Sequence, residues 1–94
     1  DEDILDAIRY HTTGRAGMSA LELVIFVADA IEPTRKNYPG LVAIRAQAAQ
    51  DLRQAALTAL TGTQDFIKIK GGINSPLSAQ AIADLNAQLA QPQP

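Results

Sequence analysis

A nearly unbroken apolar segment, residues 21–31, is the feature that most limits what this chain can fold into. Glu22 and Asp29 are its only polar residues. Ser19 and Glu22 form a Ser-x-x-Glu capping box at its start, and Pro33 follows its end, so the segment is predicted to be a helix despite its β-branched residues. A helix that is apolar on nearly all sides is expected to be central and covered by its neighbours.

The rest of the chain also shows helical signals. Asp51 and Gln54 make a second capping pair, Gly71 and Gly72 interrupt the pattern, and Pro76 stands at a tolerated first-turn position. Five helices are predicted, over residues 3–10, 19–31, 41–49, 51–70 and 76–90. Since 94 residues support one hydrophobic core, we expect one all-α domain over residues 1–90 and a disordered tail at 91–94.

Composition excludes several classes of protein. Eight basic residues against ten acidic ones give a net charge of −2, which argues against nonspecific nucleic-acid binding. The chain has no cysteine, so disulfides, thiolate nucleophiles and cysteine-bound zinc are excluded. No apolar run reaches the roughly 18 residues of a membrane span, and no secretion signal is visible, which favours a cytoplasmic protein.

Asp29 is the most informative polar residue because it lies on the most apolar helix. A buried, unpaired carboxylate is very costly, so a buried Asp29 would need a metal ion, a nearby arginine or His11. The alternative is that Glu22 and Asp29, seven residues apart, form one narrow seam that faces solvent. Spacing alone does not decide between the two.

His11, the only histidine, opens a polar loop that resembles an anion pocket with a metal ligand at its edge. Thr12 and Thr13 offer hydroxyl donors, Gly14 permits a close approach of the backbone, and Arg15 can bind a phosphate oxygen. The plainer alternative is that His11 is a helix cap or an ordinary surface residue.

Two cations, Arg35 and Lys36, follow the central segment. They either complement the negative end of the helix dipole or clamp a polyphosphate. A two-metal phosphohydrolase needs several histidines and carboxylates to hold its ions, and this chain has one histidine. The residues therefore indicate part of a site.

Two motifs, in the right order and at the right separation, closely resemble the YqeK family of HD-superfamily phosphohydrolases. They are Ala7–Arg15 with Met18-Ser19, and Ala28-Asp29 with Ile31–Pro33 and Arg35. The likeness continues more weakly to Pro76, where Ser75 replaces a histidine that the family often has. It implies an all-α HD-domain bundle of which this chain is the C-terminal half.

The resemblance also implies an activity and the residues that serve it. The family hydrolyses diadenosine tetraphosphate symmetrically to two ADP at a di-iron or similar dinuclear metal centre. By this likeness His11 and Asp29 are metal ligands, and the phosphate pocket includes Thr12, Thr13, Gly14 and Arg35, to which the residue chemistry adds Arg15. The expected ligand is a dinucleoside polyphosphate.

The family's remaining metal ligands, namely its first His, a His-Asp pair and a further His, would precede Asp1. We therefore expect this chain alone to bind metal weakly and to hydrolyse little or nothing, unless another segment supplies the N-terminal half. The alternative function is a non-catalytic helical module. It would associate with itself or with a partner through an apolar face left exposed on the central helix.

Overall fold

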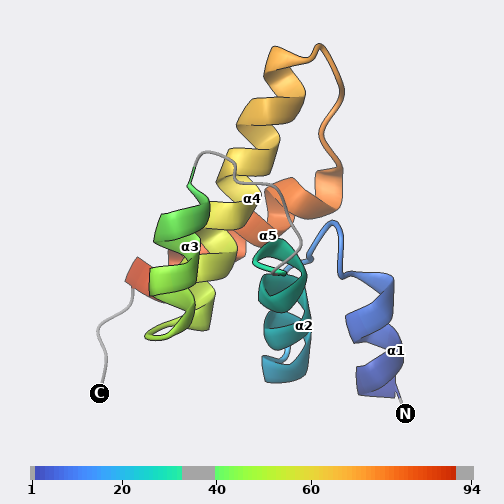
Figure 1. The fold of residues 1–94 in the computed structure, drawn as a ribbon. Helices are drawn as coiled ribbons and strands as arrows, with labels where there is room; N and C mark the ends of the chain where they lie inside the picture. The colour runs from blue at the N-terminus through green and yellow to red at the C-terminus, as the bar shows by residue number, and fades with distance from the viewer. Residues whose placement is uncertain (1, 33–39, 91–94) are drawn as a thin grey trace.

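The computed structural model describes residues 2–32 and 40–90, and in these ranges it confirms the all-α prediction (Figure 1). Its helices are α1 (Glu2–Arg9), α2 (Ala20–Ala30), α3 (Leu41–Ala48), α4 (Leu52–Ile69) and α5 (Pro76–Ala90). Each agrees with a predicted helix to within a residue or two at either end.

The helix starts are where the capping signals placed them. The Ser19 hydroxyl accepts a hydrogen bond from the Glu22 amide at 3.2 Å, and the Glu22 carboxylate accepts one from the Ser19 amide at 3.3 Å, which completes the capping box of α2. Asp51 caps α4 by accepting from the Arg53 amide at 3.0 Å. Pro76 is the first residue of α5. These signals act locally, which is why the sequence alone reveals them.

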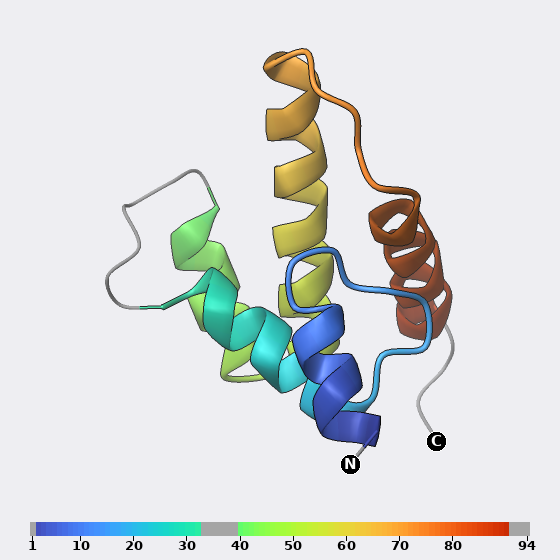
Figure 2. The same ribbon diagram turned by 90° about the vertical axis from the view of Figure 1, so that its right-hand side faces the viewer.

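Helix α4 is the element on which the others assemble. Helices α2, α3 and α5 each pack on α4, whereas α1 packs on α2. Figure 2 shows α3 and α5 on opposite sides of α4, with α1 lying outside α2. The last turns of α4 extend past the other helices in both views.

The core is built around small side chains on α4. Ala55, Ala56 and Ala59 are buried there, and their short side chains let three helices approach α4 closely. The core residues are Leu23, Phe26 and Val27 of α2, Ile44 of α3, Ala55, Ala56, Ala59 and Leu60 of α4, and Ala81 and Leu85 of α5. This clustering accounts for the high alanine content of α4.

Apolar side chains of α1 and α2 remain at the surface. Ile4, Leu5 and Ile8 of α1 are 52%, 50% and 61% exposed, and Val24 and Ile25 of α2 are 44% and 38% exposed. The prediction that neighbours cover the central helix is therefore correct for one side of α2 only. Its other side has no covering helix among the described residues.

Some sequence predictions fall outside the described residues. Arg35 and Lys36 belong to residues 33–39, and the tail predicted to be disordered is 91–94. Among the helices that are described, none combines the length and the hydropathy needed to cross a membrane.

Candidate metal and phosphate site

A cleft of about 980 Å³ opens between α2, α3 and α4 and reaches the end of α1. His11 and Asp29, the two predicted metal ligands, both line it, and so does Thr12. Its other lining residues are Phe26, Ala30, Gly40, Ile44, Gln54, Leu57, Thr58, Ala59, Thr61, Gly62, Thr63, Asp65, Phe66 and Ile69. The fold thus brings together residues 18 positions apart in the sequence.

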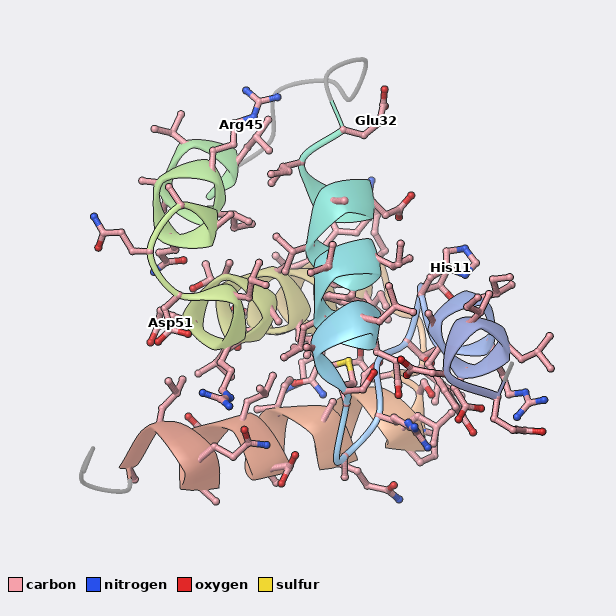
Figure 3. The ribbon with its side chains drawn as sticks, turned by 90° about the horizontal axis from the view of Figure 1, so that it is seen from below. His11, Glu32, Arg45 and Asp51 are labelled. Atoms are coloured by element: carbon pink, nitrogen blue, oxygen red, sulfur yellow. The ribbon has the colours of Figure 1, made fainter. Side chains whose placement is uncertain are left out.

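His11 is held in an orientation that suits a metal ligand. The side chain is exposed just beyond the end of α1 (Figure 3). Its Nδ1 atom lies 2.5 Å from the Ile8 carbonyl oxygen. Because a carbonyl oxygen only accepts, this contact assigns the proton to Nδ1 and leaves the lone pair on Nε2. Metal-binding histidines are commonly oriented by such a hydrogen bond from the second ring nitrogen.

Asp29 lies next to the negative end of a helix dipole. It is exposed in the last turn of α2, and the residues of that turn include no basic one. Both the carboxylate and the helix C-terminus favour a cation at this place. Of the two alternatives that spacing left open, the solvent-facing one holds for Asp29, whose residue is exposed and lines the cleft. The case for a cation at Asp29 is therefore electrostatic and does not depend on burial.

The acid that is buried on α2 is Glu22, which is 2% exposed. The alternative of a solvent-facing seam therefore does not hold for Glu22. Arg15 neutralises it: Nε donates to Oε2 at 2.8 Å and Nη2 donates to Oε1 at 2.6 Å. These hydrogen bonds lower the pKa of the Glu22 carboxyl, outweighing the effect of burial.

Arg15 is held by protein groups in this structure. Besides Glu22, its Nη2 atom contacts Asp6 Oδ2 at 3.4 Å, and its guanidinium carbon lies 4.8 Å from the centre of the Tyr10 ring. Arg15 is not among the residues that line the cleft. Its structural role is thus to join the loop after α1 to both α1 and α2.

Thr13 and Gly14 also lie away from the lining of the cleft. Ser78 of α5 donates a hydrogen bond to the Thr13 carbonyl at 2.8 Å. Gly14 is buried with a φ of +67°, and a Cβ built there would lie 3.4 Å from that of Ala81. Of the predicted phosphate residues, Thr12 alone is seen to line the cleft, and Arg35 is outside the described ranges.

The sequence reasoning missed the residues of α4 that form the long wall of the cleft. Gly62, Asp65 and Phe66 lie there, and the Phe66 ring is 61% exposed. The signal was present, since Phe66 falls outside the apolar stripe of residues 52, 56, 60, 63 and 67. An aromatic residue outside the buried face of a helix indicates an exposed ring, and this position could have marked Phe66 as a candidate binding residue.

A metal ion fits the donor chemistry of His11 and Asp29 as part of a larger ligand set. An imidazole nitrogen and a carboxylate oxygen suit iron or manganese. Within residues 2–32 and 40–90, no three His, Cys, Asp or Glu side chains are grouped so that they could hold an ion. The described residues therefore do not form a metal site by themselves, and the metal-binding role of His11 and Asp29 stays a prediction.

Comparisons with known proteins identify the relatives of this chain. It is 45% identical over 91 residues to a Halalkalibacterium halodurans protein named symmetrical bis(5'-nucleosyl)-tetraphosphatase, a match that covers 97% of this chain and 46% of the relative. A Bacillus subtilis protein of the same name is 54% identical over 70 residues, which cover 74% of this chain and 37% of the relative. No protein-family model matches.

A solved structure confirms the fold. The crystal structure of a predicted HD superfamily hydrolase involved in NAD metabolism, from Clostridium acetobutylicum, matches with a TM-score of 0.88 at 41% identity. The match covers 94% of this chain and 46% of that one. The chain is thus homologous to symmetrical bis(5'-nucleosyl)-tetraphosphatases and to part of an HD superfamily hydrolase. The chain spans about half the length of the Halalkalibacterium halodurans relative, and its match covers a smaller share of the Bacillus subtilis relative.

Proposed function

We propose that this chain forms part of the active site of a metal-dependent HD-type phosphohydrolase that cleaves dinucleoside tetraphosphates symmetrically. The observation that carries the proposal is that His11 and Asp29 line the same cleft, with the Nε2 lone pair of His11 left available by the contact at Nδ1. The homology to proteins named for this reaction supports it.

His11 and Asp29 would hold a divalent metal, with iron as the first candidate and two metals in the complete site. A metal bound there would polarise the phosphoryl oxygens and lower the pKa of a bound water. Thr12, at the edge of the same cleft, would donate its hydroxyl proton to a phosphate oxygen. Water would attack phosphorus, the central phosphoanhydride bond would break, and diadenosine tetraphosphate plus water would give two ADP.

We expect weak activity from this chain by itself. Two ligands do not hold a metal firmly, and the described residues contain no larger cluster. The remaining ligands would come from a segment equivalent to the unmatched half of the relatives, either within a longer polypeptide or as a separate chain. Metal affinity is therefore a necessary readout beside turnover.

The test is hydrolysis of diadenosine tetraphosphate by the purified chain under anaerobic conditions, with Fe(II) or Mn(II), and with products separated by chromatography. Mn(II) binding is followed in parallel by electron paramagnetic resonance. His11→Ala and Asp29→Asn should each weaken Mn(II) binding at least tenfold and remove any ADP formation, while the circular dichroism spectrum stays helical.

Arg45→Ala is the matched control, because Arg45 is an exposed residue of α3 that does not line the cleft (Figure 3). It should leave metal binding and turnover unchanged. Mn(II) binding that is equally strong in the wild type, His11→Ala and Asp29→Asn would contradict the proposed site, whatever the turnover.

The second candidate function is a non-catalytic module that associates through the outer faces of α1 and α2. The specific observation is the exposure of Ile4, Leu5 and Ile8 on α1 and of Val24 and Ile25 on α2, two helices that pack on each other. Exposed apolar side chains on neighbouring helices favour association with another apolar surface. For the isolated chain we propose that this surface is a second copy.

Sedimentation velocity tests this candidate. The wild type should form a dimer at micromolar concentration, and Ile8→Lys should be monomeric. Val42→Lys is the control, since Val42 of α3 is 74% exposed and lies on another helix. A wild type that stays monomeric up to millimolar concentration would exclude this candidate, and an effect of His11→Ala on association would favour neither function.

A further inference from the structure

The wall of the cleft formed by α4 has a chemistry different from that of the end with His11 and Asp29. It presents an exposed aromatic ring at Phe66, a carboxylate at Asp65 and the bare helix surface of Gly62. We propose that this wall is a nucleoside subsite, in which Phe66 stacks on the base and Asp65 accepts hydrogen bonds from the ribose hydroxyls. The proposal rests on the proposed function and deepens it.

Phe66 is suited to stacking because its ring is accessible. The side chain is 61% exposed although it lines a cleft, and the ammonium nitrogen of Lys70 lies 5.6 Å from its ring centre. Lys70 thus lies over one face of the ring, and the high exposure of Phe66 is what leaves ring surface for a partner outside the core. Stacking of bases on such rings is a general mode of nucleotide recognition and tolerates any base.

Gly62 leaves room for a planar group next to this ring. It precedes Phe66 by one helical turn, so both residues lie on the same face of α4. A Cβ built at Gly62 would meet no atom within 4 Å. Glycine in the interior of a helix costs stability relative to other residues, so its presence beside an exposed ring indicates a reason other than folding.

Asp65 gives the wall its polarity. Its carboxylate is exposed in the cleft, and no described residue donates a hydrogen bond or forms an ion pair to it. An ionised carboxylate only accepts hydrogen bonds, so it repels phosphate and accepts from hydroxyl groups. A carboxylate that binds ribose hydroxyls is a recurrent device in nucleotide sites. The nucleoside would thus lie on α4 with its phosphates directed toward His11 and Asp29.

The name of the relatives fits one such subsite for each nucleoside diphosphate half of the substrate, since symmetrical cleavage of a bis(5'-nucleosyl) tetraphosphate divides it into equal halves. ADP is therefore the smallest probe that carries both the nucleoside and its share of the phosphates. Tripolyphosphate carries phosphates alone, and 2'-deoxyadenosine diphosphate lacks one ribose hydroxyl.

The test is binding of these three probes to this chain in the presence of a chelator, measured by saturation-transfer-difference NMR and chemical-shift titration. The wild type should transfer saturation to the adenine protons of ADP, prefer ADP to its 2'-deoxy analogue, and bind tripolyphosphate weakly. Phe66→Leu keeps the apolar bulk but removes the ring, and should raise the Kd for ADP about tenfold. Phe66→Tyr should retain binding.

Two further variants separate binding from folding. Gly62→Leu should abolish ADP binding while the melting temperature holds or rises, because leucine fills the bare surface and is a better helix former than glycine. Asp65→Asn should remove the preference for ADP over its 2'-deoxy analogue. Ile73→Ala is the control, since Ile73 is 96% exposed but does not line the cleft.

The results distinguish this proposal from the proposed function. Failure of the wild type to bind ADP, or binding that Phe66→Leu and Gly62→Leu leave unchanged, would overturn the nucleoside subsite even if turnover depends on His11. ADP binding that depends on Phe66 and Gly62 would support the subsite even if His11→Ala and Asp29→Asn show that no metal site exists.

Discussion

The guanidinium of Arg15 donates two hydrogen bonds, of 2.8 Å and 2.6 Å, to the buried carboxylate of Glu22. The same carboxylate accepts from the Ser19 amide and so caps α2, while Arg15 also contacts Asp6 of α1. This ion pair therefore connects α1, the loop that carries His11 and the start of α2. It helps to hold the His11 loop in position, although Arg15 and Glu22 do not line the cleft.

Breaking this pair from one side should destabilise the fold strongly. Arg15→Met leaves the Glu22 carboxylate, 2% exposed, without its counter-charge, and removal of one partner of a buried ion pair costs about 3 kcal/mol. Urea unfolding followed by circular dichroism measures the loss. The double variant Arg15→Met/Glu22→Leu should recover most of it, because no buried charge is left over. A double variant as unstable as the single one would contradict this account.

The pH dependence of stability should report the same carboxylate. The folded-state pKa of Glu22 lies below its ordinary value of 4.5, so the folded state is stabilised fully above that pH. This contribution is lost as the pH falls below 4.5 toward the folded-state pKa. Thermal unfolding between pH 7 and pH 3 measures it. Glu22→Gln should flatten the acid limb of the curve, and Asp65→Asn should leave it in place.

The loop that carries His11 should become more mobile around Gly17 when one of its two hydrogen bonds to α5 is removed. The Gly17 amide donates a hydrogen bond of 2.8 Å to Asp84 Oδ2, a charge-assisted contact between residues far apart in the sequence. Asp84→Ala should speed hydrogen exchange at the Gly17 amide at least tenfold, with little change at the amides of α4. Gln88→Ala is the matched control, because Gln88 contacts the same carboxylate from within α5. Unchanged hydrogen exchange at the Gly17 amide would show that the hydrogen bond to Asp84 does not order the loop.

Gly14 and Gly17 should differ in their tolerance of larger side chains. Both have positive φ, +67° and +75°, so a Cβ strains the backbone at either site by about 1 kcal/mol. A Cβ built at Gly14 would meet Ala81 and Leu60, whereas a Cβ built at Gly17 would meet no atom within 4 Å. Gly14→Val should therefore cost at least about 1 kcal/mol more than Gly17→Val in urea unfolding, through overpacking. An equal loss of unfolding free energy in the two variants would mean that side chains of α4 and α5 shift to accommodate the valine.

Local features of the fold were predictable from the sequence because their causes span only a few residues. The capping box of Ser19 and Glu22, the Asp51 cap and the proline at the start of α5 each depend on contacts within one turn. Helical periodicity likewise indicated that residues such as Leu60 and Leu85 face the core. The motifs around His11 and Asp29 pointed to relatives that the comparisons confirm.

Tertiary structure decided which charges are buried and which residues share a cleft. Periodicity treats Glu22 and Asp29 alike, but Arg15 folds back from the preceding loop onto Glu22, so Glu22 is the buried acid and Asp29 is left at the cleft. Phe66 joins His11 only because α4 packs on α2. The sequence by itself therefore determined the helices and their ends, since those depend on neighbours along the chain. The environment of each charge depends on distant segments, and only the packed helices reveal it.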